Sequence, residues 1–480
     1  MGVAIGIVFG ALPGLTATMG VAVFLPFTFG MEPITAFALL LGIYCGGIYG
    51  GSITAILIRT PGTPSAAATV LDGYPLAQKG EAFGALSAAT IASFLGGLFS
   101  CLALILLAPQ LASIALQFGP PEYFAVGLFG LSIVSSVSGE DILKGVLGAM
   151  LGLVIATIGM DPITGDTRFT FGSLSLMNGV DFVSSLIGLF AISEVLSKAE
   201  SLYRDVKLGK IGHVAGKMVS MKIMLANTVN VIRSSIIGTV IGIIPATGSG
   251  MASWLSYNEA KRASKEPQLF GKGSYEGVVA AETANNAVTG GALVPLLTLG
   301  IPGDVVTAIL LGSLMIQGLT PGPQLFTEHA DVVAGIYGMM VLSNVFMLLL
   351  GLLGINLFVR MLKVPSSILM PCVLVLTFVG AFAINSSIFD MRVAVLMGLI
   401  GYLFTKTGFP IPPILLGLIL GPIIESNFRR SVTISKGDMS IFLMRPISIC
   451  FILLSLLAFC WPMIRRAWDA HKTKRAQMQQ

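Results

Sequence analysis

Long apolar runs dominate the 480-residue chain and limit its fold more than any other feature. A helix that crosses a bilayer needs about 20 apolar residues. Runs of this kind lie at 84–108, 122–138, 142–160, 182–197, 332–359, 367–384, 391–405 and 441–464, and we expect the long run 332–359 to be tilted, or broken near Gly351 and Gly354. Only 11% of the residues are charged, whereas soluble domains carry roughly 25%. The sequence therefore predicts an all-α polytopic integral membrane protein with roughly 12 membrane-embedded segments.

Two apolar regions, 1–75 and 233–325, are interrupted repeatedly by Gly, Pro, Ser, Thr and Asn. Their uninterrupted pieces, such as Ile53–Ile58 and Ala292–Leu299, are too short to cross a bilayer, so we expect broken or re-entrant helices in both regions. The same order of Gly-x3-Gly-x2-Pro, Gly-Gly and Pro-Gly occurs twice, in Gly6–Pro13, Gly50-Gly51 and Pro61-Gly62 and again in Gly238–Pro245, Gly290-Gly291 and Pro302-Gly303. We expect two pseudo-symmetric repeats, 1–197 and 231–464.

Basic residues gather between the predicted repeats and at the end of the chain. Residues 198–230 form a basic linker and residues 465–480 a basic tail. Because basic segments beside membrane spans tend to stay in the cytoplasm, we place both there. Nucleic-acid binding is the rival interpretation of these clusters, but no aromatic or Gly-rich binding motif accompanies them.

Corresponding breaks in two repeats predict the binding site of a transporter, because non-helical backbone at membrane depth must line a cavity or be buried. A half-helix that begins there presents free N–H groups to an anion. Hydroxyls beside these N–H groups suit carboxylate oxygens. The predicted substrate-binding residues are Pro13, Gly14, Thr16, Thr18, Arg59, Thr60, Pro61, Gly62, Thr63, Thr247, Gly248, Ser249, Pro302 and Gly303. The alternative is that these Gly and Pro residues serve only helix packing and kinks.

Arg59 interrupts an apolar stretch, and an ionisable residue at membrane depth suggests function. It could grip a carboxylate bidentately. Alternatively, it lies at a water-facing loop end or pairs with Asp72.

A second polar group, Glu282, Asn285, Asn286 and Asp304, predicts a coupling-cation site for Na⁺ or H⁺, because hard cations prefer carboxylate and amide oxygens. In the alternative, Glu282 caps a helix or pairs with Lys261 or Lys272, and Asp304 only caps the helix that follows Pro302.

Catalytic motifs are missing from the sequence. It contains no GxSxG, HExxH or Walker A motif, so we expect no enzyme and no ATP hydrolysis. The cysteines form no CxxC pair and the three histidines are scattered, so we expect no metal centre beyond Na⁺ and no cofactor. The residues before the Pro13-Gly14 turn lack the pattern of a cleavable signal peptide, so we expect none there.

Several motifs resemble the large membrane subunit of the tripartite tricarboxylate transporters, the TctA type, and the resemblance covers nearly the whole chain. They are Tyr49–Ile53, Thr60–Gly62, Leu71–Pro75, Phe118–Phe124, Arg168–Gly172, Ala284–Ala287 and Leu299–Gly303. The resemblance implies secondary transport of tricarboxylates or related carboxylates across a bacterial inner membrane, driven by an ion gradient. It also implies two partners, a small four-helix membrane subunit and a periplasmic solute-binding protein.

The sequence departs from this family at two places. Members usually have about one more membrane segment before the first Gly-rich turn, so we expect a truncated or misassigned start. Many members carry Asn where Arg59 stands, so citrate is not assumed to be the substrate. An anion channel or a passive membrane scaffold is the alternative function; a channel would conduct without a binding protein.

Overall fold

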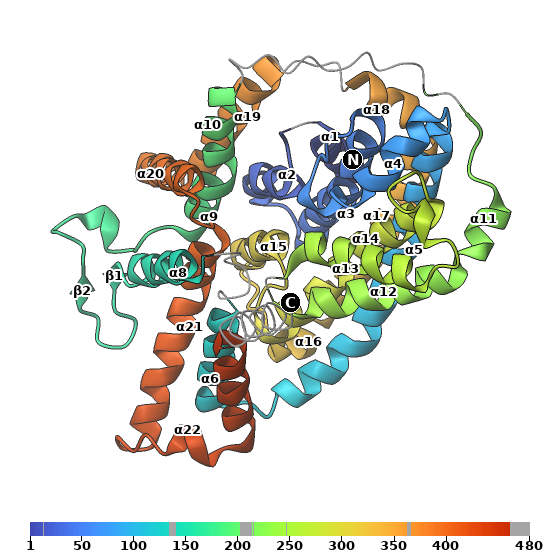
Figure 1. Cartoon of the computed structure of the whole chain (residues 1–480). Helices are drawn as coiled ribbons and strands as arrows, with labels where there is room; N and C mark the ends of the chain where they lie inside the picture. Colours follow the sequence, from blue (N-terminus) through green and yellow to red (C-terminus); the bar gives the residue numbers. More distant parts are fainter. Residues whose placement is uncertain are drawn as a thin grey trace, which may run out of the picture. The chain divides into compact units, whose positions relative to one another are not determined.

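The computed structural model describes residues 1–12, 14–133, 141–201, 214, 216–245, 247–361 and 366–460. Its regular structure is almost entirely helical, and two short strands, β1 (Gly159–Met160) and β2 (Thr167–Arg168), pair antiparallel as a hairpin (Figure 1). Six helices in the described part of the chain are long and apolar enough to cross a membrane: Pro33–Ile58, Ala82–Ala115, Phe182–Glu200, Ala330–Leu353, Ser367–Asn385 and Ile388–Thr407. Together with the shorter apolar helices, they confirm the all-α polytopic prediction.

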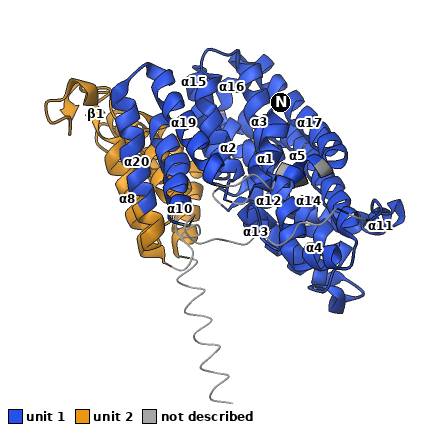
Figure 2. Cartoon of the chain, turned by 90° about the horizontal axis from the view of Figure 1, so that it is seen from above, with its two compact units in different colours: residues 1–115, 183–402 blue, residues 116–182, 403–480 orange. Residues whose placement is uncertain are grey.

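The chain folds into two compact units, and each unit combines two separate stretches of sequence (Figure 2). The first unit contains residues 1–115 and 183–402, and the second contains 116–182 and 403–480. Each unit therefore takes a stretch from both predicted repeats. The repeat boundaries stay predictions, and the tail 465–480 and linker residues 202–213 and 215 lie outside the described residues.

The first unit is built around two long buried helices, α3 (Pro33–Ile58) and α14 (Tyr275–Leu299). The unit also contains α1 (Gly2–Ala11), α2 (Ala17–Phe24), α4 (Thr69–Gln78), α5 (Ala82–Ala115), α9 (Phe182–Leu186), α10 (Ser193–Ser201), α11 (Met221–Ala226), α12 (Thr228–Ile243), α13 (Gly248–Ala263), α15 (Val305–Ile316), α16 (Pro323–Glu328), α17 (Ala330–Leu353), α18 (Ile355–Met361), α19 (Ser366–Asn385) and α20 (Ile388–Thr407). Short helical turns η1 (Leu25–Thr28), η2 (Pro64–Ala66), η4 (Ile187–Ile192) and η5 (Pro267–Leu269) connect several of them.

The two long helices correct one expectation. The sequence predicted that Ile53–Ile58 and Ala292–Leu299 are isolated short pieces, but both are the ends of continuous helices of 26 and 25 residues. Gly, Ser, Thr and Asn do not interrupt these helices, because their small or polar side chains are buried against other helices while the helical backbone bonds persist. The breaks come only afterwards, at Pro61 and Pro302.

The predicted break in the run 332–359 is confirmed at Gly354, where α17 ends and α18 begins at the next residue. Gly351 instead lies inside α17, where a Cβ atom would meet Thr90 and Tyr49. The run 122–138 corresponds to α6 (Pro120–Ser132), and residues 134–138 lie outside the described part.

The second unit contains α6, α8 (Ile142–Ala156), the β1–β2 hairpin, the turn η3 (Leu174–Leu176), α21 (Pro412–Ile434), α22 (Ile441–Met444) and a helical segment at Pro446–Cys460. Sequence reasoning missed α21 as a helix, because Glu425, Arg429 and Arg430 interrupt its apolar run. In the structure α21 packs on both α6 and α8, and a Cβ at Gly152 of α8 would lie 2.1 Å from the Ile414 carbonyl oxygen of α21.

Candidate functional site

Two helix crossings in the first unit have the same construction. Helix α1 crosses α3 at Gly10, where a Cβ atom would lie 3.0 Å from the Cα of Gly50. Helix α12 crosses α14 at Gly242, where a Cβ atom would lie 3.0 Å from the Cα of Gly291. Small residues at both crossings let the backbones approach closely. The equivalent of Gly50 is therefore Gly291, one position later than the sequence comparison placed it.

The ends of α3 and α14 match in the same register, 241 residues apart. Each helix ends in a left-handed residue, Arg59 with φ 59° and Gly300 with φ 72°. The next N–H bonds back to a carbonyl in the same way, from Thr60 to Thr54 (3.4 Å) and from Ile301 to Pro295 (3.3 Å). Positions in the two long helices therefore correspond when 241 is added.

After each break, the backbone packs against the shorter helix of the same half, which is α1 in the first half and α12 in the second. A Cβ atom at Gly62 would lie 2.0 Å from the carbonyl oxygen of Gly10, and one at Gly303 would lie 2.4 Å from that of Gly242. Only glycine allows such an approach. The Pro-Gly sequences thus close two equivalent backbone junctions, as expected if they serve one architecture.

After the junctions the two halves differ. Thr63 precedes η2, and its hydroxyl pairs with that of Ser65 at 2.7 Å. Asp304, the equivalent of Thr63, caps α15 by accepting the N–H of Thr307 at 2.8 Å. The Tyr44 hydroxyl of α3 also donates to Asp304. This hydrogen bond joins the first half to the residues that follow the break in the second half. Asp304 therefore has the capping role that the sequence left open, whereas its cation role stays a prediction.

Glu282 and Asn285 of the predicted cation group do come together. Glu282 is fully buried on α14, and its carboxylate accepts from Thr69 of α4, from Ser93 of α5 (3.1 Å) and from the Asn285 amide (3.2 Å). The predicted alternative of pairing with Lys261 or Lys272 is wrong, because the partners of Glu282 in the described structure are neutral. Sequence reasoning missed Thr69 and Ser93, since no local signal marks partners so distant in the chain.

Three buried oxygen atoms on α14 have no hydrogen-bond partner among the described residues. They belong to Thr283, Asn285 and Asn286. The Asn286 amide turns instead towards the Met347 sulfur, at 3.3 Å. Leaving a buried polar atom unsatisfied costs about 1–3 kcal/mol. A helix that retains several such atoms next to a buried carboxylate is therefore suited to accept a further ligand.

Three predicted substrate residues flank the start of α2. Thr16 caps this helix by accepting the Met19 N–H at 3.1 Å, and Thr18 lies half-buried in its first turn. Gly14 has φ 90°, and a Cβ atom there would meet the side chain of Lys198. Pro13 lies outside the described residues. The hydroxyl of Thr16 thus serves helix capping in this structure.

Arg59, Thr60 and Pro61 lie on the exposed side of the first break. The Arg59 guanidinium stands over the Tyr74 ring at 5.9 Å, a cation–π contact. Pairing with Asp72 is not what the structure has, because Asp72 is buried and bonded to other groups. Arg59 thus lies at an exposed loop end. This was one of the two alternatives to carboxylate binding, the other being an ion pair with Asp72.

The start of α13, which follows the end of α12, lies next to the break at Pro61. A Cβ atom at Gly250 would lie 3.5 Å from the carbonyl oxygen of Pro64. The Thr247 hydroxyl donates to the carbonyls of Ile241 and Ile244, closing α12, and no side chain caps α13. Gly248 and Ser249 are half-buried in the first turn. Since no side chain among the described residues accepts from the first N–H groups of α13, these groups are available to an anion.

Asp72 ties the two halves together, a role that sequence reasoning did not find. Its Oδ1 accepts the N–H groups of Gly271 (2.8 Å), Gly273 (2.8 Å) and Ser274 (2.9 Å), and its Oδ2 accepts the Tyr257 hydroxyl (2.9 Å). Asp72 thereby fixes α4 to the loop that leads into α14. This contact supports the position of Thr69 against Glu282.

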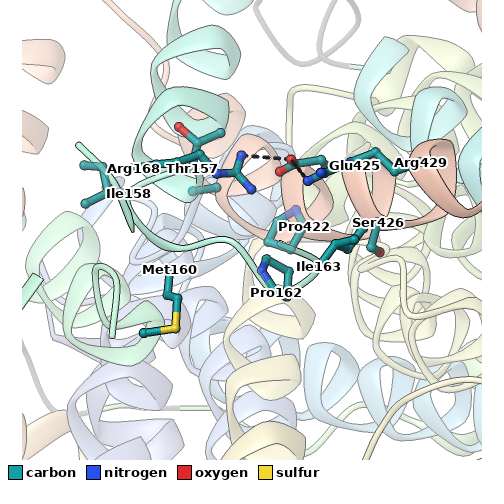
Figure 3. Close-up of a pocket in the computed structure, with 11 residues that line it drawn as sticks. Thr157, Ile158, Met160, Pro162, Ile163, Arg168, Pro422, Glu425, Ser426 and Arg429 are labelled. Carbon is teal, nitrogen blue, oxygen red and sulfur yellow. Dashed lines mark hydrogen bonds and ion pairs between the residues drawn. The ribbon is translucent and has the colours of Figure 1, made fainter. Parts of the chain in front are cut away.

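The second unit has a pocket of its own, between the hairpin and α21 (Figure 3). Arg168 of β2 pairs with Asp161 (3.0 Å) and Glu425 (2.8 Å), and Arg429 also pairs with Asp161 (2.6 Å). The Arg429 guanidinium, followed by the N–H of Ile163, holds the pKa of Asp161 well below its usual range. Because the two acids and two guanidiniums compensate one another, the network fastens the hairpin to α21 without a net charge.

Comparisons with known proteins agree with this architecture. A family model described as the tripartite tricarboxylate transporter TctA family matches residues 1–416. The chain belongs to this family. An uncharacterized 52.8 kDa protein from Agrobacterium vitis, named for the TAR-I ttuC' 3' region, is 40% identical over 448 residues, 93% of this chain and 89% of the relative. A second uncharacterized A. vitis protein, named for the TAR-II ttuC' 3' region, is 38% identical over 220 residues, 46% of this chain and 91% of that protein. No solved structure matches.

Membership in the TctA family identifies the chain as a membrane transport protein and agrees with the motif resemblance. The match includes both breaks and the whole of α3 and α14, since all of these lie within residues 1–416. The paired junctions are therefore features of the matched region of a TctA-family protein.

Proposed function

We propose that the chain is the permease subunit of a secondary-active tripartite transporter that imports tricarboxylates or related carboxylates. It works in a bacterial inner membrane with its C-terminus in the cytoplasm. A periplasmic binding protein delivers the substrate, a small four-helix subunit completes the complex, and a Na⁺ or H⁺ gradient drives uptake. Family membership supports this proposal, and the uncapped start of α13 carries it.

The start of α13 offers a carboxylate what it needs without a basic side chain. The N–H groups of Gly248, Ser249 and Gly250 have no side-chain cap, and the macrodipole of this 16-residue helix adds partial positive charge. The carbonyl side of Pro64 lies next to Gly250, so the site adjoins the break of the other half. A substrate held there would contact both halves, as alternating access requires.

Two substitutions at Gly248 test this site. Gly248 has φ 72°, and a Cβ atom there would meet nothing within 4 Å. Asn and Asp both tolerate this backbone and have nearly the same shape. Gly248→Asp adds a negative charge near the bound carboxylate; two such charges about 5 Å apart repel by roughly 3 kcal/mol at an effective dielectric constant near 20. Gly248→Asn is the matched neutral control.

The assay is uptake of labelled tricarboxylate into proteoliposomes that contain the full chain and both partners. We expect uptake only under an ion gradient, a KM at least tenfold higher for G248D, and a KM within about threefold of the wild type for G248N. Uptake that continues after the gradient is collapsed would contradict the coupling. Non-saturating flux without the binding protein would favour an anion channel instead.

A further inference from the structure

We propose that Asn285, together with the hydroxyls of Thr63 and Ser65, binds Na⁺. This inference rests on the proposed function and deepens it, because it assigns the coupling ion and its ligands. The sequence predicted that Thr63 binds substrate, whereas this inference assigns its hydroxyl to the cation.

The sequence repeat relates the proposed Na⁺ site to the hydrogen bond between Tyr44 and Asp304. Adding 241 converts Tyr44 to Asn285, and Thr63 to Asp304. Tyr44 of α3 bonds to Asp304, which begins α15 in the other half. Correspondingly, α14 packs against η2 as α3 packs against α15. The repeat therefore predicts that Asn285 faces Thr63 as Tyr44 faces Asp304.

The two side chains differ in length at these equivalent places. A tyrosine hydroxyl lies about 3 Å farther from its Cα than the amide oxygen of an asparagine does, by standard bond lengths. Tyr44 spans the distance to Asp304 directly, whereas Asn285 cannot reach Thr63 in the same way. Oxygens that share a hard cation at about 2.4 Å each stand farther apart than hydrogen-bonded oxygens. A small cation shared by Asn285 and the hydroxyl pair would make up this difference in reach.

The orientation of the Asn285 amide supports the same conclusion. Its Nδ2 donates to the Glu282 carboxylate at 3.2 Å, and a flipped amide would place oxygen against that carboxylate. The amide oxygen therefore points away from Glu282. It is fully buried, and no partner for it exists among the described residues. An unpaired, buried acceptor needs a donor or a cation.

The chemistry of the surrounding groups favours a monovalent ion. Thr63 and Ser65 are buried hydroxyls, 4% and 1% exposed, which retain lone pairs while one donates to the other. The carboxylate nearest to Asn285 is that of Glu282, whose partners are the hydroxyls of Thr69 and Ser93 and the Asn285 amide. A single carboxylate with neutral oxygens compensates one positive charge. A divalent ion would call for more acidic ligands.

The test measures Na⁺ binding without transport. The unfolding midpoint of the purified full chain in nanodiscs is followed against NaCl concentration, with choline chloride holding the ionic strength constant, because a ligand that binds only the folded state raises this midpoint. We expect NaCl to raise the midpoint of the wild type and KCl to have little effect. In Asn285→Ala and in Thr63→Val the half-saturating Na⁺ concentration should rise at least tenfold.

Asn344→Ala is the matched control. Asn344 is fully buried on α17, and its amide oxygen also has no partner in the described part of the chain. This variant loses a similar buried amide but should keep the wild-type Na⁺ response. Wild-type Na⁺ dependence in both N285A and T63V, or no Na⁺ response in the wild type, would overturn the assignment. The uptake assay with G248D and G248N is separate, so carboxylate transport can hold while the Na⁺ site fails.

Discussion

Alanine at the two glycine crossings provides a graded test of the packing beneath the site. At Gly10 a Cβ atom would lie 2.1 Å from the carbonyl oxygen of Gly47. Because a carbon atom ordinarily keeps about 3.5 Å from such a group, α1 and α3 must separate by roughly 1.4 Å. Overpacking of this kind costs about 1–3 kcal/mol. The helix-forming preference of alanine returns up to about 1 kcal/mol, so we expect Gly10→Ala to destabilise the fold by about 2 kcal/mol.

The second crossing should give a smaller loss. At Gly242 the nearest contact of a Cβ atom would be 2.7 Å, to the carbonyl oxygen of Val288. The required separation is then roughly 0.8 Å, and the net cost of Gly242→Ala is about 1 kcal/mol.

The control is Gly338→Ala in α17, because a Cβ atom at Gly338 would meet nothing within 4 Å. This variant should be stabilised by up to about 1 kcal/mol. Denaturant unfolding of the purified full chain in detergent measures all three. The expected order of stability is G338A, wild type, G242A and then G10A. If G10A and G242A unfold at the same denaturant concentration as G338A, the backbone-to-backbone crossings described here are not present.

Three further predictions concern single polar contacts. Tyr44→Phe removes the donor to Asp304 and should lower the free energy of unfolding by about 1–2 kcal/mol, measured by the same denaturation. Asp72→Asn should make the 264–274 loop more accessible to protease than in the wild type, because one amide oxygen replaces a carboxylate that accepts four bonds. The lowered pKa of Asp161 means that its contact with Arg429 contributes fully above the unfolded pKa near 4 and is lost as the pH falls through the folded value. Protease resistance of the hairpin should therefore stay constant from pH 8 to about 5, and unchanged resistance in Asp161→Asn would contradict this role.

The sequence was sufficient to predict the helical membrane class, most spans and the break at Gly354, because these depend on local hydropathy and on glycine. It misjudged α3 and α14, since glycine-rich helix faces and real interruptions look alike until the partner helix is known. Gly47 and Gly50 do not interrupt α3, because α1 packs against α3 at these two glycines.

The hydrogen-bond partners of the candidate site residues could not be predicted from the sequence. Glu282 and Asn285 were predicted from their carboxylate and amide oxygens, and the structure brings them together. Asn286 of the same predicted group turns to the Met347 sulfur instead. Thr69 lies 213 positions from Glu282, and Tyr44 lies 260 positions from Asp304. Only the fold decides which distant residue meets each of them. The repeat offset of 241 also became reliable only when the crossings fixed which glycine opposes which.

Gly10 packs directly against the backbone of α3, and Gly242 packs in the same way against α14. These two contacts limit how the molecule can change shape. Where main chain rests on main chain, no side chain can rotate to absorb a sliding movement. The α1–α3 pair and the α12–α14 pair should each move as one rigid body. Any rearrangement that exposes a cargo to the opposite side must then come from the non-helical residues at the ends of these pairs, such as Leu15 and Thr16 or Ile244 and Pro245.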